Sequence, residues 1–148
     1  MKRNYFILTV SLAFVLASCA TADQKIPTIA NDFCNCLGKL EKTMSQELKN
    51  LYINAGNSED PRAALAKAMM ELGPEKQASI GEELKGFAIE DPRSEVGGCM
   101  AELQKKYKDE KTRSKKKFGE KLLAELKSKT GCSLTYAIMK MGFQKKFD

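Results

Sequence analysis

Residues 28–51 read TIANDFCNCLGKLEKTMSQELKNL and carry one apolar stripe at helical spacing. The stripe residues recur at steps of three and four, and they are Ile29, Phe33, Leu37, Leu40, Met44, Leu48 and Leu51. Side chains at these steps share one face of an α-helix, so the spacing predicts a helix with a single buried side. Pro27 and Thr28 suit its start and Gly56 suits its end, which predicts about seven uninterrupted turns.

Two proline pairs predict the next helix boundaries. Asp60-Pro61 has the residue types of an N-cap and a first helical position, so a second helix is expected to start there. Gly73-Pro74 ends that helix and starts a third, which is expected to run from about Pro74 to Ile89 on an apolar side that includes Ile80 and Leu84.

The C-terminal half also has helical periodicity. Apolar residues at helical spacing run through residues 94–129, as one helix or as two joined by a turn, with a turn near residues 109–114 favoured. Gly131 closes this part, and Ser133 can cap a last helix. Leu, Ala, Met, Lys and Glu favour helices, so the chain is expected to be all-α, a bundle of five or six helices.

The N-terminal segment has the features of an export signal. Lys2 and Arg3 make a basic start, residues 5–16 are apolar, and small residues follow. The apolar part is shorter than the roughly 20 residues that a lasting membrane span needs. One interpretation is an ordinary secretory signal that happens to contain Cys19.

The favoured interpretation depends on the run Leu16-Ala17-Ser18-Cys19, which resembles the lipobox of bacterial lipoproteins. The resemblance implies that a diacylglycerol is attached to Cys19 and that the preceding peptide is removed. It implies a location in the bacterial cell envelope. Ala20 follows the cysteine where proteobacterial lipoproteins retained in the inner membrane carry Asp, which favours the outer membrane. The chain is therefore divided into a leader (1–18), a lipidated tether (19–27) and one helical domain (28–148).

The composition excludes several kinds of site. The chain has no His, so catalytic triads and Cys–His pairs that use imidazole are excluded, as are zinc sites that need it. No Gly-rich phosphate loop and no nucleophile with an adjacent base is apparent. We therefore expect no catalytic residue, no metal and no cofactor.

Four cysteines remain beside Cys19, namely Cys34, Cys36, Cys99 and Cys132. An even number in an exported chain predicts two disulfides. At about 100° per residue, Cys34 and Cys36 lie on opposite edges of the stripe that contains Phe33, so they point apart, which disfavours a bridge between them within a regular helix. Cys36 and Cys99 both lie close to apolar stripes, so the favoured pairing is Cys36–Cys99 with Cys34–Cys132.

A thiol function is the alternative to a structural one. Free thiolates with methionines could bind a soft ion such as Cu(I), or the cysteines could carry out redox chemistry. Met44, Met69, Met100 and Met141 fall on apolar stripes, where filling the core is the commoner role.

The net charge is concentrated in residues 104–117, which hold eight basic and two acidic side chains. The basic ones are Lys105, Lys106, Lys108, Lys111, Arg113, Lys115, Lys116 and Lys117. Such a run attracts anions, so the candidate partners are anionic lipid, a polyanionic glycan or an acidic protein, and nucleic acid is not expected. The alternative is a solvated helix surface without a partner.

These observations predict an envelope lipoprotein, held at the membrane by Cys19, with a small non-catalytic helical domain for interaction or structure. The alternative is a thiol-redox or Cu(I)-binding protein that uses the four domain cysteines.

Overall fold

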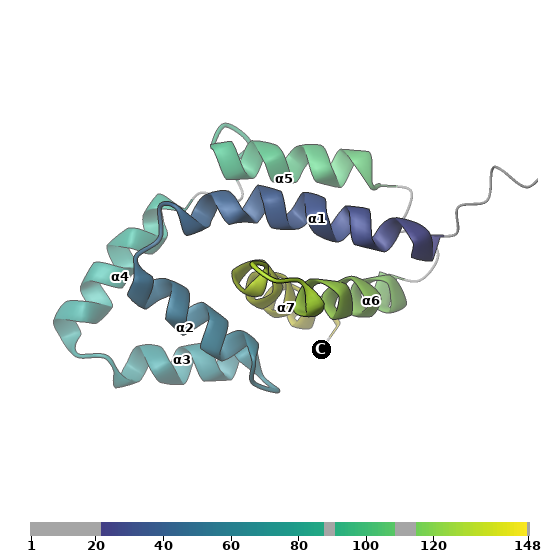
Figure 1. Ribbon diagram of the computed structural model, residues 1–148. Helices are drawn as coiled ribbons and strands as arrows, with labels where there is room; N and C mark the ends of the chain where they lie inside the picture. Colours follow the sequence, from purple (N-terminus) through teal and green to yellow (C-terminus); the bar gives the residue numbers. More distant parts are fainter. Residues whose placement is uncertain (1–21, 88–90, 109–114, 148) are drawn as a thin grey trace, which may run out of the picture.

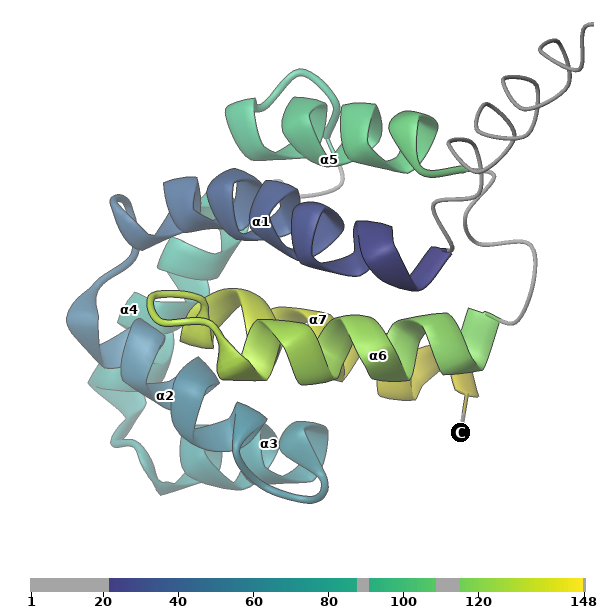
Figure 2. The ribbon, with the colours of Figure 1, turned by 45° about the vertical axis from the view of Figure 1, so that its right-hand side comes forward.

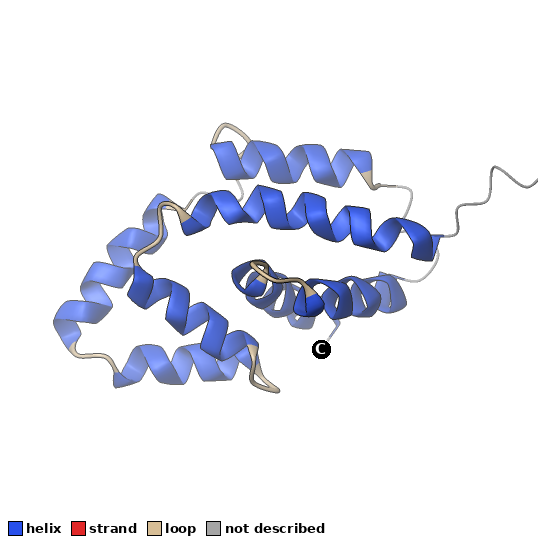
Figure 3. Cartoon of the chain, in the orientation of Figure 1, coloured by secondary structure: helices blue, strands red, loops and turns tan. Residues whose placement is uncertain are grey.

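The computed structural model describes residues 22–87, 91–108 and 115–147, and every regular element in these ranges is a helix (Figure 3). The helices are α1 (Ala22–Glu41), α2 (Gln46–Gly56), α3 (Pro61–Glu71), α4 (Pro74–Gly86), α5 (Glu95–Lys106), α6 (Lys115–Ser128) and α7 (Ser133–Phe147). The predicted all-α bundle is confirmed, with seven described helices in place of the expected five or six.

The helices form a bundle with a lobe at one end. α5 lies along α1 on one side, and α6 and α7 pack on the other side (Figures 1 and 2). α2, α3 and α4 form the lobe, which joins the bundle mainly where α2 packs against α7. α1 is therefore the central helix, and it contacts α5, α6 and α7.

The prediction of one long helix over residues 28–56 was wrong, because the chain turns between α1 and α2. Ser45 caps α2, and its hydroxyl accepts a hydrogen bond from the backbone N–H of Leu48 at 3.2 Å. Leu37, Leu40 and Leu48 are all buried in one cluster on both sides of the turn. The apolar spacing therefore continues across the turn, which is why periodicity alone did not show it.

The start of α1 also differs from the prediction. α1 begins at Ala22, and Pro27 lies inside it. Pro27 is the sixth residue of α1, so α1 lacks the one hydrogen bond that an N–H at this position would donate to the carbonyl four residues earlier. The predicted tether over residues 19–27 is therefore helical from Ala22 onward.

The other predicted boundaries agree more closely. Asp60 caps α3, because its carboxylate accepts hydrogen bonds from the N–H groups of Arg62 and Ala63. α4 begins at Pro74 as predicted and ends at Gly86, before the predicted end near Ile89, a residue that lies outside the described residues. Residues 94–129 contain two helices, as favoured, while the expected turn at 109–114 lies outside the described residues.

Two buried clusters form the core. One surrounds the cysteines and includes Phe33, Leu103, Leu122 and Leu126. The other lies between the bundle and the lobe and includes Leu37, Leu48, Ile80 and Leu134. α1 contributes to both clusters, so it connects the two halves of the core.

Candidate functional site

The first candidate site is the cysteine framework. The structure joins Cys34 to Cys132, with their Cα atoms 5.5 Å apart, and Cys36 to Cys99, with Cα atoms 5.8 Å apart. These are the two favoured pairs. Cys34 and Cys36 leave α1 in different directions, so one bridge reaches the start of α7 and the other reaches α5.

The two bridges lie in different surroundings. Cys36 is fully buried within the core. The Cys34–Cys132 bridge lines a surface groove of about 330 Å³. Asn31, Asn35 and Lys129 also line this groove, so its wall is largely polar. In this oxidised form all four sulfur atoms are bonded, and none is a thiolate ligand.

A second groove, of about 370 Å³, lies where α4 ends beside α1 and α5. Leu40, Phe87 and Val96 form part of its wall. The hydroxyl of Thr43 donates to the carbonyl oxygen of Leu40, at 3.1 Å. The hydroxyl of Ser94 caps α5 by accepting from the N–H of Gly97, at 2.9 Å. These hydroxyl groups therefore hold helix ends in place.

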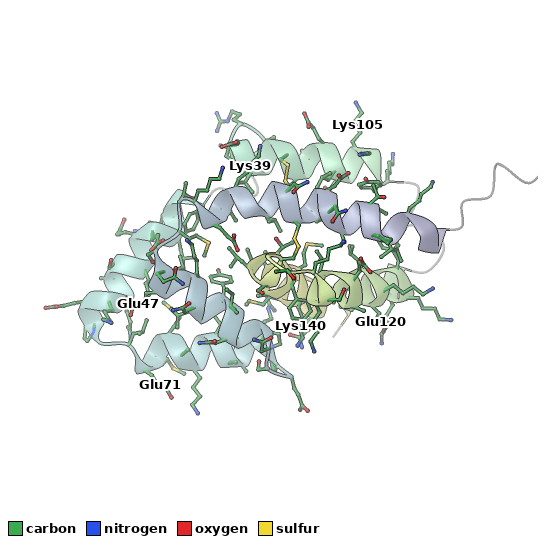
Figure 4. The ribbon with its side chains drawn as sticks, in the orientation of Figure 1. Lys39, Glu47, Glu71, Lys105, Glu120 and Lys140 are labelled. Atoms are coloured by element: carbon green, nitrogen blue, oxygen red, sulfur yellow. A yellow bond between two sulfur atoms is a disulfide. The ribbon has the colours of Figure 1, made fainter. Side chains whose placement is uncertain are left out.

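The basic run is divided between two helices. Lys105 and Lys106 end α5, Lys108 follows them, and Lys116 and Lys117 lie in the first turn of α6. All five side chains are exposed. In Figure 4 Lys105 extends away from the bundle.

The remaining predicted site residues are described in part or not at all. Cys19, Lys111 and Arg113 lie outside the described residues. Lys115 begins α6, and its side chain lies outside the described part.

Sequence reasoning did not find a polar cluster between α1 and α5. Lys106 Nζ donates to Asp32 Oδ2 at 2.8 Å, and the Tyr107 hydroxyl donates to the same oxygen. Lys106 Nζ also lies 5.1 Å from the centre of the Tyr107 ring. The partners are more than 70 residues apart in the chain, so no local motif could have shown them.

The cluster shifts the pKa values of its members. Hydrogen bonds from Lys106 and then from Tyr107 stabilise the carboxylate of Asp32, so its pKa is lowered. The hydrogen bond to Asp32 raises the pKa of Lys106. Burial, followed by the hydrogen bond to Asp32, raises the pKa of Tyr107. Near neutral pH the arrangement is thus an ion pair joined by a neutral phenol, which is a helix-to-helix contact.

Lys140 makes a second contact that the sequence did not indicate. Its Nζ donates to the carbonyl oxygens of Gly56 and Ser58, at 3.1 and 2.6 Å. These carbonyls lie at the C-terminal end of α2, where a cation is favourable. In Figure 4 Lys140 lies on the bundle side, and the contact joins α7 to the lobe.

The described residues hold neither a cluster suited to a metal ion nor a helix suited to span a membrane. Within the described ranges, no group of three or more Cys, Asp or Glu side chains is arranged to hold a metal ion. None of the described helices is both long and apolar enough to cross a bilayer. No protein-family model, no curated protein and no solved structure matches the chain.

Proposed function

We propose that the chain is a lipid-anchored protein of a bacterial cell envelope, with a small non-catalytic helical domain for interaction or structure. The observation that carries the proposal is the leader that ends in Leu16-Ala17-Ser18-Cys19. A basic start, a short apolar segment and small residues before a cysteine are the pattern that lipidation requires. The proposed anchor is a diacylglycerol on Cys19, and the outer membrane is the favoured location.

The domain supports this proposal by its construction. Two bridges tie α1 to α5 and to the start of α7, and stable disulfides are typical of proteins outside the cytoplasm. The polar groups described above connect helices or cap their ends. A domain of this kind is suited to present a fixed surface next to a membrane.

Mass spectrometry of the protein purified from its host membrane tests the anchor. We expect an N-terminal peptide that begins at Cys19 and carries fatty acyl chains, and incorporation of labelled palmitate. The Cys19→Ala variant is expected to lose both signals. An acyl-free Cys19 in the membrane-purified protein would overturn the proposal.

A thiol-redox role is the second candidate, and the groove beside the Cys34–Cys132 bridge is the observation that favours it. A small thiol can reach a disulfide only where the surface admits it. Free-thiol labelling of the protein, isolated without reductant, separates the two roles. Two intact bridges that resist glutathione support a structural role, whereas ready reduction of Cys34–Cys132 alone supports the redox role.

A further inference from the structure

The charges of this protein are separated between the two ends of the molecule. The start of α1, the end of α5 and the start of α6 lie together at one end (Figures 1 and 2). Four exposed lysines lie there, and we name this surface the basic end: Lys105, Lys108, Lys116 and Lys117. Lys106 is left out because it pairs with Asp32.

The sequence around the basic end has a clear excess of positive charge. Residues 102–108 and 115–121 contain seven basic and two acidic side chains. Residues 41–87 and 91–95, which form the described part of the lobe and its connections, contain ten acidic and seven basic side chains. The lobe lies at the opposite end of α1 from the basic end (Figure 1). The molecule is therefore positive at one end and negative at the other.

The position of Cys19 relates this polarity to the membrane. α1 begins at Ala22, three residues after Cys19. Three residues span at most about 11 Å, even when fully extended. If Cys19 carries the proposed lipid, the start of α1 must lie within about that distance of the bilayer. This distance is close to the Debye length of about 8 Å at physiological ionic strength, so the surface potential of the bilayer acts on charges at this end.

We infer that the basic end docks on the anionic phospholipid headgroups of the bilayer that holds the anchor. The inference rests on the proposed lipidation for its geometry. Lysine ammonium groups are attracted to such a surface, and the acidic lobe is repelled from it. The anchored domain is then oriented, with α2, α3 and α4 on the side away from the membrane. A glycan or an acidic protein would not require the basic residues to lie beside the anchor.

Flotation with vesicles separates this inference from the proposed function. The protein purified from its host membrane is mixed with vesicles of phosphatidylcholine alone, or of phosphatidylcholine and phosphatidylglycerol. A lipidated chain floats with both kinds. A chain that floats only with the anionic vesicles, and is released by salt, lacks the lipid anchor, but its basic end binds anionic lipid. Flotation with neither kind overturns both ideas.

Amine labelling then measures the orientation of the anchored protein. The lysines of the vesicle-bound protein are acetylated on each kind of vesicle. For each lysine, the rate on anionic vesicles is divided by the rate on vesicles of phosphatidylcholine alone. We expect the four basic-end lysines to react about fivefold more slowly on anionic vesicles, which corresponds to roughly 1 kcal/mol of attraction for each charge. Lys42, in the turn before α2, and Lys67 of α3 are expected to react equally on both kinds of vesicle. High salt should remove the difference in rate at the basic end.

A variant with all four lysines changed to Gln tests the cause. These positions are exposed, so the fold is expected to tolerate the changes. Lys25 in the first turn of α1 and Lys121 in the second turn of α6 report on docking. They are expected to be protected on anionic vesicles in the unchanged protein and to lose this protection in the variant.

The matched control removes the same number of positive charges elsewhere. It carries Lys42→Gln, Arg62→Gln, Lys67→Gln and Lys127→Gln, all at exposed positions. This control is expected to keep the protection of Lys25 and Lys121. Equal labelling of the basic end on both kinds of vesicle would overturn the inference, as would protection by soluble dextran sulfate without protection by anionic vesicles.

Discussion

Asp32 is a residue at which a single carboxylate joins two helices. Its Oδ2 atom accepts hydrogen bonds from Lys106 and Tyr107, and these lower its pKa. A lowered folded-state pKa stabilises the fold above the unfolded-state pKa of about 4, and this contribution is lost as the pH falls through the folded-state value.

We predict that Asp32→Asn lowers the free energy of unfolding by about 1 kcal/mol at neutral pH, because it removes a charged acceptor from a partly exposed site. The difference from the unchanged protein should be constant down to about pH 4 and should shrink below that. Urea unfolding at a series of pH values measures it. A difference that stays the same at pH 2 would show that Asp32 acts through packing and not through its charge.

Gly56 is a residue at which α2 lies close against α7. A Cβ atom added there would lie 2.5 Å from the Cβ of Ala137 and 2.7 Å from its Cα. The second of these atoms belongs to the backbone, so the helices must move apart to accept a side chain.

We predict that Gly56→Ala lowers the free energy of unfolding by about 2 kcal/mol, the cost that is typical of an overpacked contact. Gly81 in α4 provides the control, since a Cβ atom there meets nothing within 4 Å. Gly81→Ala is expected to stabilise the protein by roughly 0.5–1 kcal/mol, because alanine favours a helix. Thermal unfolding of both variants checks the contrast. Equal effects would show that α2 and α7 do not meet at Gly56.

At the scale of elements, α7 supplies a hydrogen-bond donor to the carbonyl groups at the C-terminal end of α2. Lys140 donates to the carbonyl of Gly56, the last residue of α2, and to that of Ser58, just after it. We predict that Lys140→Met, which keeps much of the apolar stem, lowers the free energy of unfolding by about 1–2 kcal/mol. Lys127→Met at an exposed site of α6 should change it by no more than about 0.5 kcal/mol. Chemical denaturation of both variants measures the difference, and similar losses would show that the cap contributes nothing.

α4 is attached to the rest of the molecule by few buried side chains. Ile80 is its only buried side chain, and Gly73 gives its start no side-chain cap. Segments with few buried apolar contacts open most readily, so we predict that the amides of α4 exchange with solvent well before those of α1. Hydrogen exchange followed by mass spectrometry tests this order. Exchange of α4 and α1 at one rate would instead indicate that the lobe and the bundle open together.

At the scale of the whole molecule, the two disulfides tie distant parts of the chain to α1. They close segments of 98 and 63 residues, and the chain-entropy model gives about 4–5 kcal/mol for each. We predict that Cys34→Ala with Cys132→Ala, and Cys36→Ala with Cys99→Ala, each lower the free energy of unfolding by about that amount. Urea unfolding without reductant measures both losses. Reduction of the unchanged protein should cost more than either pair of changes alone.

We expect the two halves of the core to unfold less cooperatively when a disulfide is removed. Cys36–Cys99 lies in the core cluster around Phe33, whereas the second cluster around Leu48 contains no cysteine. If removal of Cys36–Cys99 lowered the stability of the lobe alone, this would contradict the assignment of that disulfide to the cluster around Phe33.

The sequence by itself determined the helical class, most of the helix boundaries and the favoured cysteine pairing. Capping residues and apolar spacing act over one or two turns, so Asp60-Pro61 sets the start of α3 wherever the rest of the chain lies, whereas Ser133 is the first residue of α7 and not the cap that was expected. Cys34 and Cys36 lie on opposite edges of one helix for the same local reason, and this disfavoured a bridge between them.

Only the tertiary structure decided the turn after Glu41, the start of α1 at Ala22, and the contacts of Asp32 and Lys140. One long helix and two helices that fold back on a shared core need the same spacing of apolar residues. The spacing therefore could not distinguish these two structures. The contacts of Asp32 and Lys140 join residues more than 70 positions apart. Their energies depend on the packing of α1 against α5 and of α7 against α2, which no local pattern specifies.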